Sequence, residues 1–278
     1  MIDLHCHSTA SDGLLPPADV VQAAATLGLT ALALTDHDTT AGLAEAHEAG
    51  TRLGVEVIGG CEFSVGAPWG EMHLLAYFIE PGDPAIEAFL IAARADRSRR
   101  AREMVSRLVG LGIKVSFDDV LREAGAAAVG RPHVARALER LGHVTAVQQA
   151  FDRYIGRGRP AFVEKQLPSL HEVAALVHGR GGIVSAAHLK SYGTVANLAL
   201  LQEQGLDAVE TRHPSHTGDY LATITEAALS LGLVRTGGSD WHGETDAAGT
   251  HAALGSQQVP DEWLPLLRAR CAERARSA

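Results

Sequence analysis

The stretch Ile2-Asp3-Leu4-His5-Cys6-His7 begins as a short apolar strand and ends in two histidines that are two positions apart. Successive side chains of a strand point to opposite faces, so His5 and His7 share one face and both can reach one ion. Alone this pattern is weak, because histidines also occur as satisfied core or surface residues. A metal site here is indicated only if later strands bring further ligands close to His5 and His7.

A strand-then-helix rhythm follows this first strand. Apolar runs that predict strands alternate with amphipathic segments that predict helices, which is typical of a parallel α/β sheet. We predict strands at residues 2–5, 29–35, 55–60, 74–78, 183–187, 208–211 and 233–236. Helices are predicted at about 16–27, at 169–179, at 217–231 and at 261–275. One more is predicted after the second strand, ending at about 53, and another begins at about 195. The pattern predicts an α/β fold with a barrel-like sheet.

The rhythm stops near Pro81-Gly82-Asp83-Pro84 and resumes after Gly156-Arg157-Gly158-Arg159-Pro160. The residues between these points predict several helices and no convincing strand. Pro132 stands at the start of one such helix, where proline is tolerated. We therefore predict a barrel formed by residues 1–79 and 161–278, with a helical insertion at 80–160.

Composition and charge restrict the class of protein. The chain has 278 residues, of which 46% are hydrophobic, and this is ample for a core. A net charge of -9 argues against a general nucleic-acid coat protein. Residues 80–160 are nevertheless basic, with 14 of the 24 Lys and Arg but 10 of the 33 Asp and Glu. The basic segment indicates either a device that seats an anion or a solvated helix face.

The sequence gives no indication of a membrane protein. It contains no apolar run of the length that crosses a bilayer, and its first residues lack the basic start and apolar run of a signal peptide. The cysteines Cys6, Cys61 and Cys271 show no CxxC spacing. We expect a cytoplasmic protein in a reducing compartment, with no membrane contact and no obligate protein partner.

Further titratable residues occur where the predicted strands end or in the loops beside them. In a parallel barrel the carboxyl ends of the strands meet at one rim, so these side chains are expected to converge. The candidate metal ligands are His5, His7, Asp12, His37, Glu62, His73, His188, Asp240 and His242. Imidazole and carboxylate without thiolate suit Mn, Fe or Zn. Nine ligands exceed what two ions need, and three ions with Glu62 as a bridge would use them all.

Five motifs resemble, in order, those of the polymerase-and-histidinol-phosphatase (PHP) family of metal-dependent phosphoesterases. They are Asp3-Leu4-His5-Cys6-His7-Ser8, Ser11-Asp12-Gly13, Thr35-Asp36-His37, Gly60-Cys61-Glu62 and Ser239-Asp240-Trp241-His242. The resemblance implies a distorted (β/α)7 TIM-like barrel with a trinuclear site, in which Mn2+ is the expected ion and Fe2+ or Zn2+ the alternatives. It implies three ligand sets, namely His5, His7, Glu62 and Asp240; Glu62, His73 and His188; and Asp12, His37 and His242.

The predicted insertion is similar to the helical cap domain of one PHP subfamily. The similarity lies in Gly130-Arg131-Pro132-His133 and in the stretch Tyr154-Ile155-Gly156-Arg157-Gly158-Arg159-Pro160. It implies a substrate held between cap and barrel, and a phosphatase of nucleoside 3′,5′-bisphosphates or an enzyme that trims the 5′ end of short RNA. Arg131 and His133 are the cap-side candidates for substrate binding. The alternative interpretation is helix capping and surface charge.

The chain departs from the family in one motif. The family often has His-Pro-x-Arg-Tyr where this chain has His188-Leu189-Lys190-Ser191-Tyr192. Lys190 is predicted to replace the arginine as a point charge, without the bidentate fork of a guanidinium. Beyond the strand at 208–211, three further residues are predicted to contact substrate, namely Arg212, His213 and His216.

The predicted reaction is hydrolysis of a phosphomonoester of a small nucleotide by metal-activated water. Arg131, Lys190 and Arg212 are predicted to stabilise charged oxygens, and His216 or a metal-bound water to protonate the leaving alcohol. The best substrate prediction is the 3′-phosphate of a nucleoside 3′,5′-bisphosphate. The alternatives are a 5′-3′ exonuclease on short oligonucleotides, a metal-dependent amidohydrolase and a nucleic-acid binding or proofreading module. No lysine lies on an early predicted strand, as an amidohydrolase would require, and no polymerase segment is present.

Overall fold

The computed structural model describes residues 1–125, 129–243 and 252–277 of the chain. The described residues form two compact units, each with a hydrophobic core of its own. The first unit is discontinuous in sequence and comprises Met1–Glu87 and Leu167–Ala278. The second unit comprises Ala88–Gln166.

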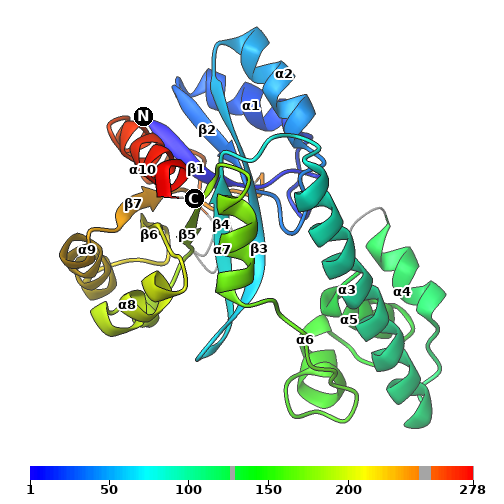
Figure 1. Cartoon of the computed structure of the whole chain (residues 1–278). Helices are drawn as coiled ribbons and strands as arrows, with labels where there is room; N and C mark the ends of the chain where they lie inside the picture. Colours follow the sequence, from blue (N-terminus) through cyan, green and yellow to red (C-terminus); the bar gives the residue numbers. More distant parts are fainter. Residues whose placement is uncertain (126–128, 244–251, 278) are drawn as a thin grey trace. The chain divides into compact units, whose positions relative to one another are not determined.

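A seven-stranded sheet forms the centre of the first unit (Figure 1). Its strands are β1 (Ile2–Cys6), β2 (Ala31–Leu34), β3 (Glu56–Ala67), β4 (Gly70–Tyr77), β5 (Ile183–Ala186), β6 (Ala208–Arg212) and β7 (Val234–Gly237). The strands are hydrogen-bonded to one another in sequence order. A strand is present at each of the seven predicted positions.

Backbone hydrogen bonds join the two ends of this sheet. The N–H of Asp240, just beyond β7, donates to the carbonyl of His5 at 2.9 Å. The N–H of His7 donates to the carbonyl of Trp241, also at 2.9 Å. The segment after β7 therefore runs alongside β1 and nearly closes the sheet. The predicted distorted (β/α)7 barrel is confirmed.

One strand runs in a direction that the sequence did not predict. β3 and β4 form an antiparallel hairpin in which Ala67 pairs with Gly70, and β4 is antiparallel to β5 as well. The bounds predicted for these two strands, 55–60 and 74–78, were wrong in that they place Glu62 after one strand and His73 before the next, whereas both residues lie within strands of this hairpin. Only two residues, Pro68 and Trp69, separate the two strands.

Helices surround the sheet in the first unit (Figure 1). They are α1 (Pro17–Thr26), α2 (Leu43–Leu53), α7 (Leu170–His178), α8 (Val195–Glu203), α9 (Asp219–Leu231) and α10 (Trp263–Ser277), with the short 3-10 helix η2 (Lys190–Tyr192). Ser169 and Glu172 form a capping box that begins α7, in which each side chain accepts the backbone N–H of the other residue. Between β1 and β4, the fully buried Tyr77 donates its hydroxyl to the carbonyl of Leu4 at 2.9 Å.

The regular elements of the second unit, among its described residues, are helices. Its elements are α3 (Pro84–Gly110), which begins within the first unit, α4 (Phe117–Ala124), α5 (Arg131–Arg140), α6 (Val147–Ala150) and the π-helix η1 (Phe151–Ile155). Met104 and Leu108 of α3 pack in one core with Val134 and Leu138 of α5. The helices predicted between residues 80 and 160 are thus present, and the role of this unit as a cap stays a prediction.

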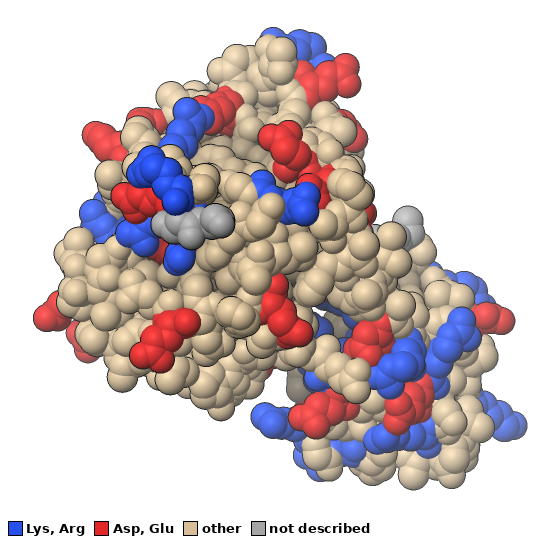
Figure 2. All heavy atoms as spheres, in the orientation of Figure 1, with Lys and Arg blue, Asp and Glu red and all other residues tan. Residues whose placement is uncertain are grey.

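Basic side chains, Lys or Arg, are frequent on the visible face of the second unit (Figure 2). Two arginines of this unit, Arg99 and Arg140, have acidic partners. Arg99 pairs with Asp96 at 2.6 Å, and Arg140 pairs with both Asp119 at 3.0 Å and Glu123 at 2.6 Å. Exposed ion pairs of this kind contribute little to stability. They favour the interpretation of these particular arginines as a solvated helix face.

No helix among the described residues is both long enough and apolar enough to cross a membrane. The three cysteines are free thiols, and Cys6 and Cys61 are buried. The prediction of a cytoplasmic setting rests on this cysteine usage and stays a prediction.

Candidate metal centre

His5, in β1, and His7, directly after β1, lie on the same side. His5 and His7 are fully buried, and their ring centroids are 5.2 Å apart. The two-residue period of a strand gives them this common direction. Gly238, after β7, packs directly against His5. A Cβ added at position 238 would lie 2.4 Å from the Cβ of His5. A side chain at position 238 would therefore displace the histidine.

The carboxylate of Glu62, in the middle of β3, lies among five imidazole rings. Its side chain is only 1% exposed. Each of five histidines has a ring nitrogen 2.7–3.3 Å from one of the two carboxylate oxygens of Glu62. They are His5, His7, His37, His73 and His188. These rings come from β1 and the residue directly after it, from the loop after β2, from β4 and from the loop after β5. Glu62 is therefore the common neighbour of segments that are far apart in sequence.

Two further carboxylates complete the cluster. Oδ1 of Asp240 is 3.3 Å from Nε2 of His5 and 3.1 Å from Nε2 of His7. Asp12, in the loop after β1, is 3.3 Å from Nε2 of His242 and 3.7 Å from Nε2 of His37. The structure thus brings together all nine residues that the sequence proposes as metal ligands.

In the part of the chain that the structure describes, the donor atoms fall into four groups, within each of which all atoms lie within 4.8 Å of one another. The groups are His7, Asp12, His37 and His242; His5, His7, Glu62 and Asp240; His37, Glu62 and His73; and His5, Glu210 and His213. The first three groups contain eight of the nine candidate ligands, and the ninth, His188, touches Glu62. Such overlapping groups of nitrogen and oxygen donors can hold several ions close together.

The contacts of His7 test whether cations fit this cluster. Among the residues that the structure describes, neither ring nitrogen of this buried histidine has a hydrogen-bond partner. A buried polar atom without a partner costs free energy and calls for an explanation. Nε2 is nevertheless 3.1 Å from carboxylate oxygens of both Glu62 and Asp240. A cation shared by the three groups would satisfy all of them, so the donor set fits a divalent metal.

The electrostatics of the cluster lead to the same conclusion. Burial raises the pKa of Glu62, but the surrounding histidines, His37 foremost, outweigh burial and hold that pKa well below its ordinary value. Burial lowers the pKa of His7, but the carboxylates of Asp240 and Glu62 outweigh burial and raise it to about 10. Without cations, protons on His5 and His7, whose pKa values are both raised, offset the charge of the buried acids. Metal ions would replace these protons on binding.

Glu210, on β6, is a fully buried acid that the sequence analysis missed. Its Oε1 is 3.1 Å from Nδ1 of His5, and its Oε2 accepts the backbone N–H of His188 at 2.9 Å. It thereby orients His5 with Nε2 toward Glu62. It also holds His188 at φ 34°, a conformation that residues other than glycine rarely adopt. The signal in the sequence was an acid inside the apolar strand 208–211.

Asp36 was quoted within a motif but given no role. Its carboxylate accepts hydrogen bonds from the backbone N–H of Ser8, the hydroxyl of Ser8 and the hydroxyl of Ser11, each at 2.7 Å. These bonds fix the loop after β1, so Asp36 positions the segment that carries Asp12.

Two residues predicted to contact substrate, Lys190 and His216, are bonded to each other. The backbone N–H of Lys190 donates to Nε2 of His216 at 3.0 Å, and Nδ1 of His216 donates to the carbonyl of Thr211 at 3.2 Å. Burial lowers the pKa of His216 to about 4, so its ring is neutral. The ring supports the turn at the exposed Lys190. The role of His216 as a proton donor stays a prediction. It requires the ring to break one of these two hydrogen bonds.

His213 and Arg212, the other candidates on this loop, differ in their surroundings. His213 belongs to the fourth donor group, and its Nε2 is 3.4 Å from Oδ2 of Asp240. The guanidinium of Arg212 instead donates to the backbone carbonyls of residues 257 and 258 and lies 5.5 Å from the ring centroid of Trp263. The structure thus places His213 in the cluster and gives Arg212 partners outside it.

Arg131 and His133 lie in the first turn of α5, in the second unit. Nδ1 of His133 accepts the backbone N–H of Gly130 at 2.9 Å. Burial lowers the pKa of His133, and the neighbouring Arg136 and Arg97 lower it further. His133 therefore caps its own helix. A contact with substrate stays a prediction for both residues.

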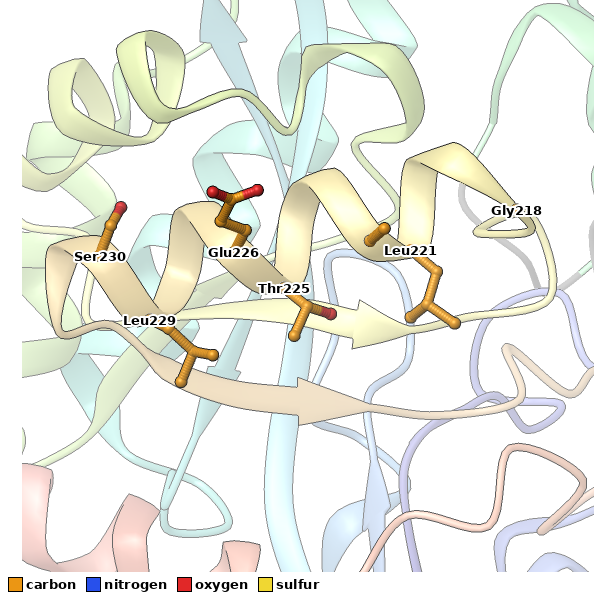
Figure 3. Close-up of a pocket in the computed structure, with 7 residues that line it drawn as sticks. Gly218, Leu221, Thr225, Glu226, Leu229 and Ser230 are labelled. Carbon is orange, nitrogen blue, oxygen red and sulfur yellow. The ribbon is translucent and has the colours of Figure 1, made fainter.

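An apolar hollow lies elsewhere on the first unit, along α9. Its volume is about 780 Å³, and Leu221, Thr225 and Leu229 follow one side of the helix there (Figure 3). None of the nine clustered residues lines this hollow. The histidine-rich cluster, and not the hollow, is therefore the candidate functional site.

Comparison with known proteins identifies the family. Residues 3–108 match the model of the PHP domain. The chain is 36% identical over 249 residues to the 3′,5′-nucleoside bisphosphate phosphatase of Chromobacterium violaceum, and the alignment covers 87% of each protein. The chain belongs to the PHP family. It is also 34% identical to a 5′-3′ exoribonuclease of Haemophilus influenzae, over 86% of this PHP protein and 89% of that enzyme.

A solved structure shares the fold of this PHP protein. It comes from Bifidobacterium adolescentis and is that of a proposed metal-dependent phosphoesterase. The two chains have a TM-score of 0.80 and 32% identity, with 97% of this chain and 96% of the other covered. The protein is a hydrolase of phosphoric ester bonds in a metal-dependent family, and it has His, Asp and Glu clusters that can bind metal. The prediction is confirmed at this level.

Proposed function

We propose that this PHP protein hydrolyses the 3′-phosphomonoester of a nucleoside 3′,5′-bisphosphate. The observation that carries the proposal is the set of five imidazole rings around the single buried carboxylate of Glu62, a donor set suited to several divalent ions. The similarity to the Chromobacterium violaceum phosphatase over most of both chains supports the choice of substrate.

The nine clustered residues are proposed as the ligands of three ions, with Glu62 shared between two of them. The proposed sets are His5, His7, Glu62 and Asp240; Glu62, His73 and His188; and Asp12, His37 and His242. Mn2+ is the proposed ion, with Fe2+ or Zn2+ as alternatives, because the donors are imidazole and carboxylate. Cys6 is left out of these sets, since its buried thiol donates to the carbonyl of Ala33.

The ions, when bound, supply a water of lowered pKa and offset the negative charge of the phosphate. The chain's own residues are proposed to position the substrate. Lys190 projects from the turn that His216 supports and is proposed to bind a phosphate oxygen as a point charge. The helical unit is proposed as a cap that contributes Arg131 and His133. Arg212 can take part only if it leaves its carbonyl partners.

A second candidate function is 5′-3′ removal of nucleotides from short RNA. The similarity to the Haemophilus influenzae exoribonuclease favours it. Both reactions use a phosphate at the metals and differ in whether a monoester or a diester is cleaved. The third candidate, C–N hydrolysis, has less support, because the chain's three lysines, Lys114, Lys165 and Lys190, all lie outside the strands that the structure describes.

Phosphate release in the presence of Mn2+ tests these candidates. The panel holds adenosine 3′,5′-bisphosphate, 3′-AMP, 5′-AMP, histidinol phosphate and a 5′-phosphorylated RNA trinucleotide. Selective turnover of the bisphosphate to 5′-AMP, shown by mass analysis, supports the proposal. Release of mononucleotides from the RNA favours the exonuclease. Failure to turn over the bisphosphate, with metal verified as bound, overturns the phosphatase proposal.

Removal of metal is expected to lower turnover at least about 1,000-fold, because metals provide several kcal/mol of the stabilisation in such sites. The measurement compares phosphate release before dialysis against a strong chelator, after it, and after Mn2+ is restored. Recovery on adding Mn2+ is expected. Full activity in protein shown to be metal-free would contradict the proposed mechanism.

Glu210→Gln is expected to weaken metal binding about 10- to 100-fold, which is typical for partners that orient a ligating histidine. The substitution keeps the volume but removes the charge that faces Nδ1 of His5. Titration of the metal-free protein with Mn2+ measures the effect. Glu203→Gln, at an exposed position of α8, is the matched control. Equal affinities in the two variants would show that Glu210 does not support the metal site.

A further inference from the structure

Two aromatic rings from distant parts of the first unit stack on each other. Trp69 lies in the turn between β3 and β4, and Tyr192 ends η2. Their ring centroids are 5.0 Å apart, and the planes are inclined by only 7°. Tyr192 is 45% exposed, so this pair lies at the surface of the unit.

The two segments that carry this pair also carry two of the clustered histidines. Trp69 precedes His73 by four residues along the chain, and Tyr192 follows His188 by four. The rings of His73 and His188 are themselves in contact, with centroids 5.1 Å apart. Four residues span at most about 13 Å of extended chain, so the aromatic pair lies close to the proposed metal ligands.

The charge beside the pair suits a nucleotide. Lys190 is exposed two residues before Tyr192 and belongs to the same short helix. A cation next to exposed aromatic rings is the combination by which proteins bind a phosphate and stack a base. Every base has a flat face, so such stacking requires no particular base.

We propose that the Trp69–Tyr192 pair is the base subsite, on which the nucleobase of the substrate stacks while its phosphate is bound at the histidine cluster. The proposal rests on the proposed function and extends it to the part of the substrate that does not react. It implies that the enzyme accepts purine and pyrimidine nucleotides alike. A purely structural role, in which the pair only attaches the hairpin turn to η2, makes a different prediction.

Substitution of the pair, tested on substrates with and without a base, separates the two roles. Trp69→Leu and Tyr192→Leu are expected to raise KM for adenosine 3′,5′-bisphosphate about tenfold with little change in kcat. The KM for ribose 3,5-bisphosphate, which lacks a base, is expected to stay unchanged. Trp69→Phe keeps a flat ring and is expected to stay near wild type. Leu229→Ala, an exposed apolar side chain near the end of α9, is the control for both substrates.

Equal loss on both substrates, or no loss on either, would overturn the base subsite while leaving the phosphatase intact. If the wild type turned over neither substrate, the proposed function would fail, and binding would still test the subsite. Stacked AMP is expected to quench the fluorescence of Trp69 in the Mn2+-loaded protein. Quenching in the wild type that Trp69→Phe removes supports the subsite, and quenching that persists in that variant contradicts it.

Discussion

Glu62→Ala is expected to lower phosphate release at least about 1,000-fold and to deplete the protein of metal. The two oxygens of Glu62 face five imidazole rings at 2.7–3.3 Å, and the proposal assigns this carboxylate to two ions at once. Its loss removes a shared ligand and the buried negative charge that offsets the cations. The measurements are kcat/KM on the best substrate of the panel and metal per chain by elemental analysis.

Glu71→Ala is the matched control for this variant, since Glu71 is an exposed acid on β4 of the same hairpin. It is expected to keep both activity and metal. Thermal melting in the presence of chelator shows whether Glu62→Ala still folds. A folded Glu62→Ala protein with wild-type metal content and activity would disprove the assignment. Loss of activity with full metal content would instead assign Glu62 to the substrate.

The positions of the strands and of the nine clustered residues were predictable because local patterns encode both. Short apolar runs between helical segments mark the strands. The clustered residues stand out as titratable groups within or just beyond such runs. Asp240 and His242 are an example, two positions apart directly after β7. A barrel then brings strand ends together whatever their separation in sequence.

Features that depend on a single distant contact were not predictable. The direction of β4 follows from its pairing with both neighbours, and a short apolar run does not encode direction. The bond between His216 and the backbone of Lys190 joins two loops, and neither loop sequence indicates it. The same holds for Arg212, which is predicted to contact substrate, whereas its guanidinium donates hydrogen bonds to the backbone carbonyls of residues 257 and 258. Glu210 was recognisable only as an acid in an apolar strand.

Asp207→Ala is expected to destabilise the protein by about 3 kcal/mol and to lower the Tm by roughly 6–12 °C. Asp207 directly precedes β6, and its side chain is fully buried. It accepts hydrogen bonds from His178 of α7 at 2.7 Å, from the backbone N–H of Val184 at 3.0 Å and from Arg274 of α10 at 2.6 Å. Its loss leaves the buried N–H of Val184 and the side chains of His178 and Arg274 without this acceptor.

The stabilisation by Asp207 is expected to depend on pH in a defined direction. Burial raises the pKa of this acid, but the hydrogen bonds from His178, Val184 and Arg274 outweigh burial and hold the pKa below the ordinary 3.8. A carboxylate with a lowered folded pKa stabilises fully above its unfolded value and loses that effect as the pH falls through the folded one. The Tm difference between wild type and Asp207→Ala should therefore be constant from pH 7 to about 5 and shrink below about pH 4.

Thermal melting at several pH values measures this, with Glu203→Ala as the control, because Glu203 is an exposed acid on α8 a short distance before Asp207. Surface substitutions of that kind change stability by about 0.5 kcal/mol or less. Metal is removed from all samples, so that metal binding does not contribute to the Tm. Equal melting of the two variants at neutral pH would show that Asp207 does not hold α7 and α10 to the sheet. A Tm difference that persisted into strong acid would show that its packing, and not its charge, stabilises the barrel.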